Sequence, residues 1–329
     1  MALRTSVSSL SKGYLFQVSG RLTFVVFSRR QVLGAGVVAG MPLALGQASA
    51  HSFAVASGSG LRMERYGDPQ RPAVALFLPE TKYPSAIIEM PEHAWRKEKA
   101  DSEQVWFYKM YTSDRALQGE VNWLKTGNAL SFSMKTSSGF TLNAKATLEA
   151  NGVAITHEVI SSSVRQLAAV EAPTCVKLYR PFTDIFLERT YIHHPEGLEL
   201  IASENADRFE KNAEEWLPCR YIAQVGKNAP PAEHRVERLD GVTRYFKSRA
   251  ADAAFLATES QPSGWAAATH AVNCGSVFTN PARTCHHADP RALAITDGRA
   301  VLRLKVYVLK GTPKDVWNIV AERERAGQA

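Results

Sequence analysis

The residues best suited to chemistry are concentrated between Asn273 and Pro290. This segment, NCGSVFTNPARTCHHADP, holds two cysteines, two histidines, an arginine and an aspartate. Asn280-Pro281 and Asp289-Pro290 predict turns, because the residue before a proline is pushed out of the helical region. We therefore expect a loop rich in ligand-type side chains, and such loops on a β scaffold commonly carry binding or catalysis.

His287 and Asp289 are the catalytic candidates in this segment. They stand two positions apart, so an extended backbone places both on one side. A carboxylate there would orient the imidazole for acid–base chemistry or for metal binding. His286 points the other way in this geometry and is a weaker candidate, for contact with a substrate. The structural alternative is that Asp289 caps the turn through its own backbone while His287 hydrogen-bonds locally.

A second group of candidates follows a predicted strand that ends near Tyr179. Arg180 is suited to bind a sugar carboxylate through two hydrogen bonds, and Tyr179 to stack on a pyranose face. The alternative for Arg180 is an ion pair with a nearby acid such as Asp184 or Glu188. His193 lies in the next predicted turn and would reach the same rim if these loops share one end of the molecule; otherwise it is an ordinary turn residue.

Arg220 and Arg244 each stand beside aromatic residues. Their surroundings are Trp216 to Tyr221 and Arg244 to Arg249. A sugar cleft uses such mixtures, because CH groups stack on rings while hydroxyl groups accept hydrogen bonds from guanidinium groups. We expect both arginines to bind substrate, with the alternative that each lies over aromatic rings of the core.

The elements that must position these residues are short apolar or alternating runs separated by turns. Phe140 to Leu148 alternates cleanly, which is typical of a strand with one wet face. Asn-Gly, Ser-Gly and Asp-Gly pairs lie between the runs, without interleaved helical periods. The pattern predicts an all-β fold, a large antiparallel β-sandwich (a supersandwich) with a short C-terminal helix at Pro313 to Arg325. Glu204 to Trp216 is predicted to be a short surface helix or a loop. Strands are predicted at 73–78, 86–90, 105–111, 129–134, 140–148, 153–160, 174–179, 198–202, 243–247, 254–258, 265–271 and 300–308.

Residues 1–50 carry the features of an export signal. Ser28-Arg29-Arg30 precedes an apolar run too short to span a bilayer, and the run ends at Ala48-Ser49-Ala50. The paired arginines resemble a twin-arginine signal. We therefore expect residues 51–329 to form one exported domain, periplasmic or secreted, that meets the membrane only during export. The alternative is an uncleaved membrane anchor.

The positive charge of the chain does not indicate a nucleic-acid partner. The net charge is +7, but five cations and no acid fall within residues 1–50. The rest of the chain is nearly balanced, so it lacks the basic footprint that nucleic-acid binding requires.

The four cysteines would meet an oxidising compartment after export, where disulfides persist. Cys175, Cys219, Cys274 and Cys285 allow three connectivities, among which sequence does not choose; Cys274 with Cys285 is the easiest pair to close. The alternative for Cys175 is a buried, reduced thiol. The sequence has no C-x-x-C motif, which argues against a zinc ribbon or a thioredoxin-type site, and no metal or other cofactor is predicted.

The second half of the chain resembles a known family. The residues that carry the resemblance are the features from Phe140 onward, Asn280, the run Cys285-His-His-Ala-Asp-Pro290 and the closing run from Arg303 to Thr312. They are similar to little-characterised bacterial proteins with a galactose-mutarotase-like β-supersandwich. Such folds host sugar epimerases, polysaccharide lyases and plain binding proteins, so the resemblance implies carbohydrate more than any one reaction. The His and Glu pattern of true aldose mutarotases has no clear match here, which puts that activity in doubt.

Three functions therefore compete. The first is an exported carbohydrate-active protein whose cleft uses the His287 and Asp289 segment and the Arg180 region, with His287 as acid or base if it is an enzyme. The second is a non-catalytic glycan-binding protein. The third is a periplasmic metal-binding protein that uses His286, His287 and His193 or His194.

Overall fold

The computed structural model describes two units of the chain, 1–51 and 52–329, each considered by itself. In the first unit, β1 (Tyr14–Val18) and β2 (Arg21–Val25) pair antiparallel. The twin-arginine residues and the Ala48-Ser49-Ala50 site of the predicted export signal lie outside the described residues. The described residues are 14–18, 21–25, 53–67, 71–79, 81–114, 117–163, 166–205, 219–226, 236–239, 242–280 and 284–327.

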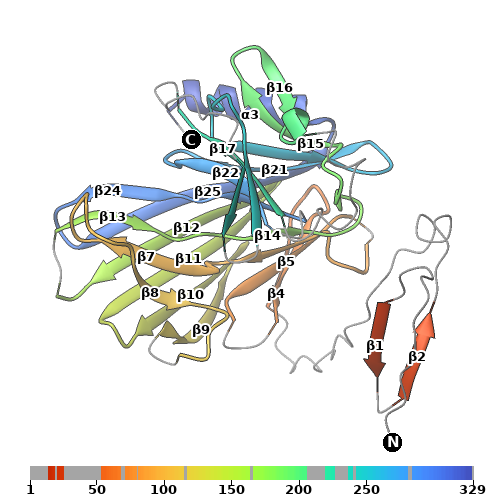
Figure 1. The fold of residues 1–329 in the computed structure, drawn as a ribbon. Helices are drawn as coiled ribbons and strands as arrows, with labels where there is room; N and C mark the ends of the chain where they lie inside the picture. The colour runs from red at the N-terminus through yellow and green to blue at the C-terminus, as the bar shows by residue number, and fades with distance from the viewer. Residues whose placement is uncertain are drawn as a thin grey trace, which may run out of the picture. The chain divides into compact units, whose positions relative to one another are not determined.

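The second unit is built from one nine-stranded, one ten-stranded and one four-stranded sheet (Figure 1). The nine-stranded sheet has the order β16 (Gly197–Leu200), β15 (Thr190–His194), β20 (Phe255–Glu259), β21 (Trp265–Ala271), β25 (Arg299–Lys310), β12 (Gly152–Ser161), β11 (Phe140–Glu149), β10 (Ala129–Thr136) and β9 (Gly119–Thr126). The ten-stranded sheet has the order β18 (Val236–Leu239), β19 (Val242–Phe246), β17 (Cys219–Gln224), β22 (Ser276–Thr279), β23 (Cys285–Ala288), β14 (Val176–Leu178), β6 (Ala86–Glu89), β5 (Ala73–Phe77), β4 (Arg62–Tyr66) and β3 (Ala54–Ala56). The four-stranded sheet has the order β24 (Arg291–Ile295), β13 (Leu167–Glu171), β7 (His93–Lys97) and β8 (Val105–Lys109).

Alternation along the strands explains how the two large sheets bury one core. In β11 every second side chain from Phe140 onward is buried, while those between them are half-buried or exposed. Leu142 of β11 and Leu304 of β25 join one apolar cluster with Ile88 of β6 and Val176 of β14. Burying each such side chain contributes roughly 1.5–3 kcal/mol. The predicted all-β sandwich with antiparallel strands is confirmed; β17 and β19 are a parallel pair within it.

Helix α3 (Pro313–Arg325) covers the other face of the nine-stranded sheet, over β21 (Figure 1). Thr312 caps the helix in a capping box with Asp315, and Pro313 occupies the first turn, where a missing N–H costs nothing. Val316 and Val320 are buried in a cluster with Phe255 of β20. The predicted terminal helix is therefore confirmed at the same boundaries.

The prediction of a loop between Asn273 and Pro290 is wrong, because the segment contains the strands β22 and β23. Short strands rich in Cys, His and Thr carry too few apolar residues to show a strand pattern in the sequence. Here the neighbouring strands impose the extended backbone, since β23 pairs with both β22 and β14. The helix or loop predicted at Glu204 to Trp216 begins in a short 3-10 helix, Ser203–Asn205, and 206–218 lie outside the described residues.

Within the described residues, no helix is both long enough and apolar enough to cross a membrane.

Candidate functional site

The candidate site lies on one face of the ten-stranded sheet, where β6, β14, β23 and β22 run side by side. Directly opposed residues of neighbouring strands share a face. Val176 is opposite Ile88 and His286, so these three side chains belong to the core. Lys177 is opposite Cys285, and His287 is opposite Phe278, on the other side of the sheet. We call that side the outer face; its members used below are Glu89, Cys175, Lys177, Arg220, Arg244, Phe278, Cys285 and His287.

His287 is held from several directions. Its Nδ1 lies 3.3 Å from Oδ1 of Asp289, which also accepts a 3.1 Å hydrogen bond from the backbone N–H of Thr174. The ring stacks on Phe278 with 4.4 Å between centroids and 7° between planes. The sequence prediction that His287 and Asp289 lie on one side is therefore confirmed as geometry. Burial alone would lower the pKa of His287, but the Asp289 carboxylate and the Cys175 sulfur raise it above its ordinary value.

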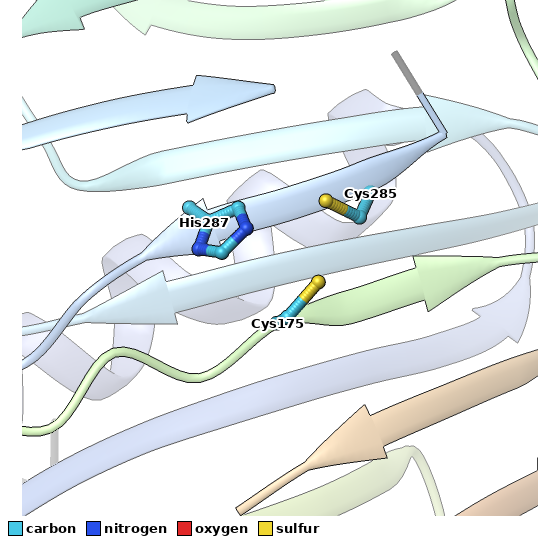
Figure 2. Close-up of side chains that lie close together, drawn as sticks. All are labelled: Cys175, Cys285 and His287. Carbon is cyan, nitrogen blue, oxygen red and sulfur yellow. The ribbon is translucent and has the colours of Figure 1, made fainter. Parts of the chain in front are cut away.

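Cys285 of β23 and Cys175, directly before β14, lie beside this imidazole. Figure 2 shows both sulfur atoms turned into the space that the His287 ring also faces. The two thiols hydrogen-bond to each other, and this contact and burial raise the pKa of Cys175 well above its ordinary value. All four cysteines are free, so the expected disulfide is not formed. Cys274, which would form the easiest disulfide with Cys285, donates its thiol to the backbone oxygen of Ser276 at 2.9 Å.

Next to the thiols, Glu89 and Lys177 form an ion pair with 2.6 Å between Nζ and Oε1. Tyr111 closes a triangle, because its hydroxyl donates to Glu89 and accepts from Lys177 at 2.8 Å. Burial raises the pKa of Glu89 despite the Lys177 ammonium. Burial would lower the pKa of Lys177, but the hydrogen bond to Glu89 raises it. The geometry favours a charged lysine in this pair.

Aromatic and cationic side chains surround these polar groups. Tyr179, two residues beyond Lys177 along the same side, is 42% exposed, and Tyr111 is 50% exposed. The guanidinium of Arg220 lies 4.6 Å from the ring centroid of Phe278. Arg220 is opposite Arg244 on β19, so the two cations share this face, and burial together with the Arg244 charge lowers the pKa of Arg220.

The structure does not bring His286 to this face. Its Nε2 lies 2.8 Å from the hydroxyl of Thr258 in the core, and burial lowers the pKa of His286 to about 3. The packing gap beside the ring leaves no room for a water molecule. His286 is therefore a core residue, which corrects its interpretation as a substrate contact.

His193 also stands apart from the cluster. His193 lies on β15 of the other large sheet, stacked 3.6 Å from Trp317 of α3 and paired at 2.8 Å with Asp252. The nine-stranded sheet and the core separate that position from the outer face, so His193 does not share a rim with His287. Arg180 is exposed directly after Tyr179. Asp184, one of the two acids considered as an alternative partner for Arg180, accepts hydrogen bonds from the 188–190 segment.

Sequence reasoning missed Glu89, Lys177, Phe278 and Tyr111 as members of the site. Alternation in the run Thr174 to Tyr179 was the available signal, because it places Cys175, Lys177 and Tyr179 on one side. The other members come from strands far apart in the chain, and only the strand order joins them.

No family model matches the chain, and no curated protein matches it. Among solved structures it is similar to a galactose mutarotase-like protein from Lactobacillus casei ATCC 334, with 10% identity over 79% of this chain and 100% of the other, and a TM-score of 0.44. A galactose mutarotase related enzyme from Lactobacillus acidophilus has 8% identity over 80% of this chain and 98% of the other, with a TM-score of 0.44. An α-N-acetylgalactosaminidase from Bifidobacterium bifidum, solved with GalNAc, has 14% identity over 83% of this chain but 39% of its own length, with a TM-score of 0.44. All three TM-scores lie below 0.5 and all three identities are 14% or less, so these matches support no conclusion about function.

Proposed function

We propose that the protein binds a saccharide that carries an acidic group on the outer face of the ten-stranded sheet. The observation that carries this proposal is the pair of exposed tyrosines at the Glu89–Lys177 ion pair. Tyr111 touches both members of the pair, and Tyr179 follows Lys177 by two positions along the same side. Exposed rings beside a fixed polar group are the combination that a sugar needs, because one pyranose presents CH groups and hydroxyl groups together.

The polar group is already oriented without a ligand. Glu89 is 3% exposed and accepts from Lys177, whose side chain remains 30% exposed. The ammonium can therefore donate to a sugar hydroxyl while the carboxylate holds it in place. Fixing donors before binding reduces the entropy that the ligand must offset.

The neighbouring arginines favour an acidic sugar over a neutral one. Arg220 and Arg244 lie opposite each other on adjacent parallel strands. Across the described part of the chain, the Nε atom of each is buried and has no hydrogen-bond partner. Two neighbouring guanidinium groups form a good receptor for a carboxylate or a sulfate on the saccharide.

We assign binding rather than catalysis to this surface. His287, the predicted acid or base, is 3% exposed and is stacked on Phe278. A group that transfers protons to a substrate must come within hydrogen-bonding distance of it. The ring of His287 instead stacks on the ring of Phe278. The guanidinium group of Arg220 makes a cation–π contact with the same Phe278 ring.

Isothermal titration calorimetry of the full chain tests the proposal. The probes are an oligogalacturonate and a neutral oligosaccharide of the same length, and we expect binding of the acidic one. Replacing Tyr179 by alanine should weaken this binding about tenfold, the equivalent of about 1.4 kcal/mol. The matched control is Tyr191→Ala, which removes a half-buried tyrosine from β15 in the other large sheet and should leave the affinity unchanged.

Product analysis after prolonged incubation separates binding from turnover, and we expect the oligosaccharide to be recovered intact. Absence of binding across a panel of acidic and neutral oligosaccharides would refute the proposal. An equal loss of affinity in the Tyr179 and Tyr191 variants would also refute it, because the ligand would then not be on the outer face.

A further inference from the structure

The buried thiols and imidazole on the outer face converge as the ligands of a metal ion do. The Sγ atoms of Cys175 and Cys285 and a ring nitrogen of His287 all lie within 4.8 Å of one another. Figure 2 shows the three side chains directed toward one space between β14 and β23. Ligand atoms around tetrahedral zinc lie roughly 3.3–3.8 Å apart, so rotations that move them by about one ångström would close the set. We propose that Cys175, Cys285 and His287 bind a thiophilic divalent cation of the Zn²⁺ class, with Glu89 as the fourth ligand.

The surroundings of His287 are those of a metal-ligating histidine. Its Nδ1 faces Oδ1 of Asp289 at 3.3 Å, which leaves Nε2 as the nitrogen available to a cation. Asp289 is itself fixed by the backbone N–H of Thr174. A carboxylate that holds the second nitrogen of a ligating histidine sets the tautomer and the ring orientation, and it is a common partner of such ligands.

Glu89 supplies an independent observation that points to a ligand. It forms a second convergent group with Cys175 and Glu92, again with ligand atoms within 4.8 Å. Lys177 occupies Oε1, whereas Oε2 is buried and has no hydrogen-bond partner among the described residues. A buried carboxylate oxygen without a partner is costly, and coordination of a cation beside Cys175 would satisfy it.

The charges of the cluster also favour a cation. Two thiolates and the Glu89 carboxylate would carry three negative charges in a site whose residues are at most 3% exposed. Three buried anions cannot remain charged without compensation. A divalent cation and the Lys177 ammonium, 2.6 Å from Glu89, together offset all three.

The competing use of the same thiols is a disulfide between β14 and β23. A disulfide would explain why the two sulfur atoms lie close together. It would not explain the His287 imidazole oriented by the Asp289 carboxylate, or the buried Glu89 Oε2 without a hydrogen-bond partner among the described residues. The soft thiolate and imidazole donors match Zn²⁺ rather than Mg²⁺ or Ca²⁺, which prefer oxygen ligands. The proposed metal site shares Glu89 with the proposed saccharide surface. Its readout is the metal itself, so Co²⁺ binding and saccharide binding can fail separately.

The test uses the full chain, purified without a histidine tag under reducing conditions and titrated with Co²⁺. We expect one equivalent to bind with a thiolate-to-cobalt charge-transfer absorption that Zn²⁺ then removes by displacement. Cys285→Ser should abolish that absorption. Asp289→Asn, which keeps the ligands but loses the carboxylate, should weaken binding by about 10- to 100-fold.

The matched control is Cys274→Ser, because Cys274 lies outside the cluster and should leave both stoichiometry and absorption unchanged. Near-ultraviolet circular dichroism checks that each variant is folded, and Glu89→Gln, which keeps both thiols, gives a second reading if Cys285→Ser does not fold; it should weaken binding. Any of three results would overturn the proposal: no charge-transfer absorption in the wild-type protein, the same absorption in Cys285→Ser and wild type, or a Cys175–Cys285 disulfide found by peptide mapping of protein purified without reductant.

Discussion

Two adjacent histidines on one short strand have opposite environments. His286 faces the core, where Thr258 is its partner and burial lowers its pKa to about 3, so the ring is neutral. His287 faces the outer side, where Asp289 and two cysteines surround it. Both rings are buried, with 2% and 3% of their surface exposed. Exposure therefore does not distinguish them, whereas their partners do.

The comparison extends to the two sides of the ten-stranded sheet. The core side collects apolar residues together with His286, whose partner is the hydroxyl of Thr258. The outer side collects carboxylates, thiols, cations and exposed rings. Strand alternation is the cause, because each residue step turns the side chain to the other side. We expect core-side changes to act on stability and outer-side changes to act on ligands.

The largest expected effect is on stability, from a core-side truncation. Ile88→Ala in β6 removes a side chain with no exposed surface, and we expect the free energy of unfolding to fall by about 2–5 kcal/mol. Denaturant unfolding measures this loss. Leu124→Ala in β9, where the side chain is 65% exposed, is the control and should stay within about 0.5 kcal/mol of wild type. Equal losses in the two variants would break the distinction between core and surface.

A smaller loss of stability is expected when the core histidine is truncated. His286→Ala should lower the free energy of unfolding by about 1–3 kcal/mol, since it empties a packed position and removes the hydrogen bond to Thr258. The folded variant should still bind one equivalent of Co²⁺ with the wild-type absorption spectrum. Loss of Co²⁺ binding in a folded protein would show that the two neighbouring histidines do not have separate roles.

The pH dependence of stability sharpens the same comparison at a second core histidine. Burial lowers the pKa of His157 from 6.5 to about 3, and its Nε2 lies 3.0 Å from the hydroxyl of Thr174. Between those pH values the unfolded chain binds more protons than the folded chain, so stability falls as the pH falls below 6.5. In His157→Gln we expect the slope between pH 6 and pH 4 to be smaller by about 1.4 kcal/mol per pH unit. Urea unfolding across that range checks this, and an unchanged slope would contradict a neutral buried ring.

The smallest effect on stability is expected on the outer side. Tyr179→Ala removes a ring that is 42% exposed, so the free energy of unfolding should change by less than about 0.5 kcal/mol. Thermal unfolding of the variant measures the change. A loss of several kcal/mol would assign Tyr179 to the framework of the protein and withdraw it from the proposed ligand surface.

Periodicity in the sequence was sufficient to predict most of the long strands and the terminal helix, but not β9 (Gly119–Thr126). Phe140–Glu149 has five buried alternating positions, and Pro313 with Val316 and Val320 marks the helix. The short strands β22 and β23 were not predictable in this way, because pairing with neighbours rather than apolar content keeps them extended. In the sequence, the polar residues of these two short strands are as typical of a loop as of a strand.

Contacts between residues that are close in the sequence could be predicted. Contacts that depend on the order of strands in the sheet could not. The pairing of His287 with Asp289 follows from their spacing. The approach of Cys175 to Cys285 and of Glu89 to Lys177 requires that β6, β14 and β23 be adjacent, although the chain visits them far apart. That order is set by the packing of the whole sandwich, and no local pattern encodes it.

Hydrogen–deuterium exchange of the full chain with and without a saturating oligogalacturonate tests the central claim most directly. We predict that the ligand slows exchange in β6, β14 and the segment around Tyr111, which carry the outer-face tyrosines and the Glu89–Lys177 pair. Exchange in β15, β16 and α3 should remain unchanged. Protection confined to β15, β16 and α3 would contradict the account, as would a bound ligand that protects neither region.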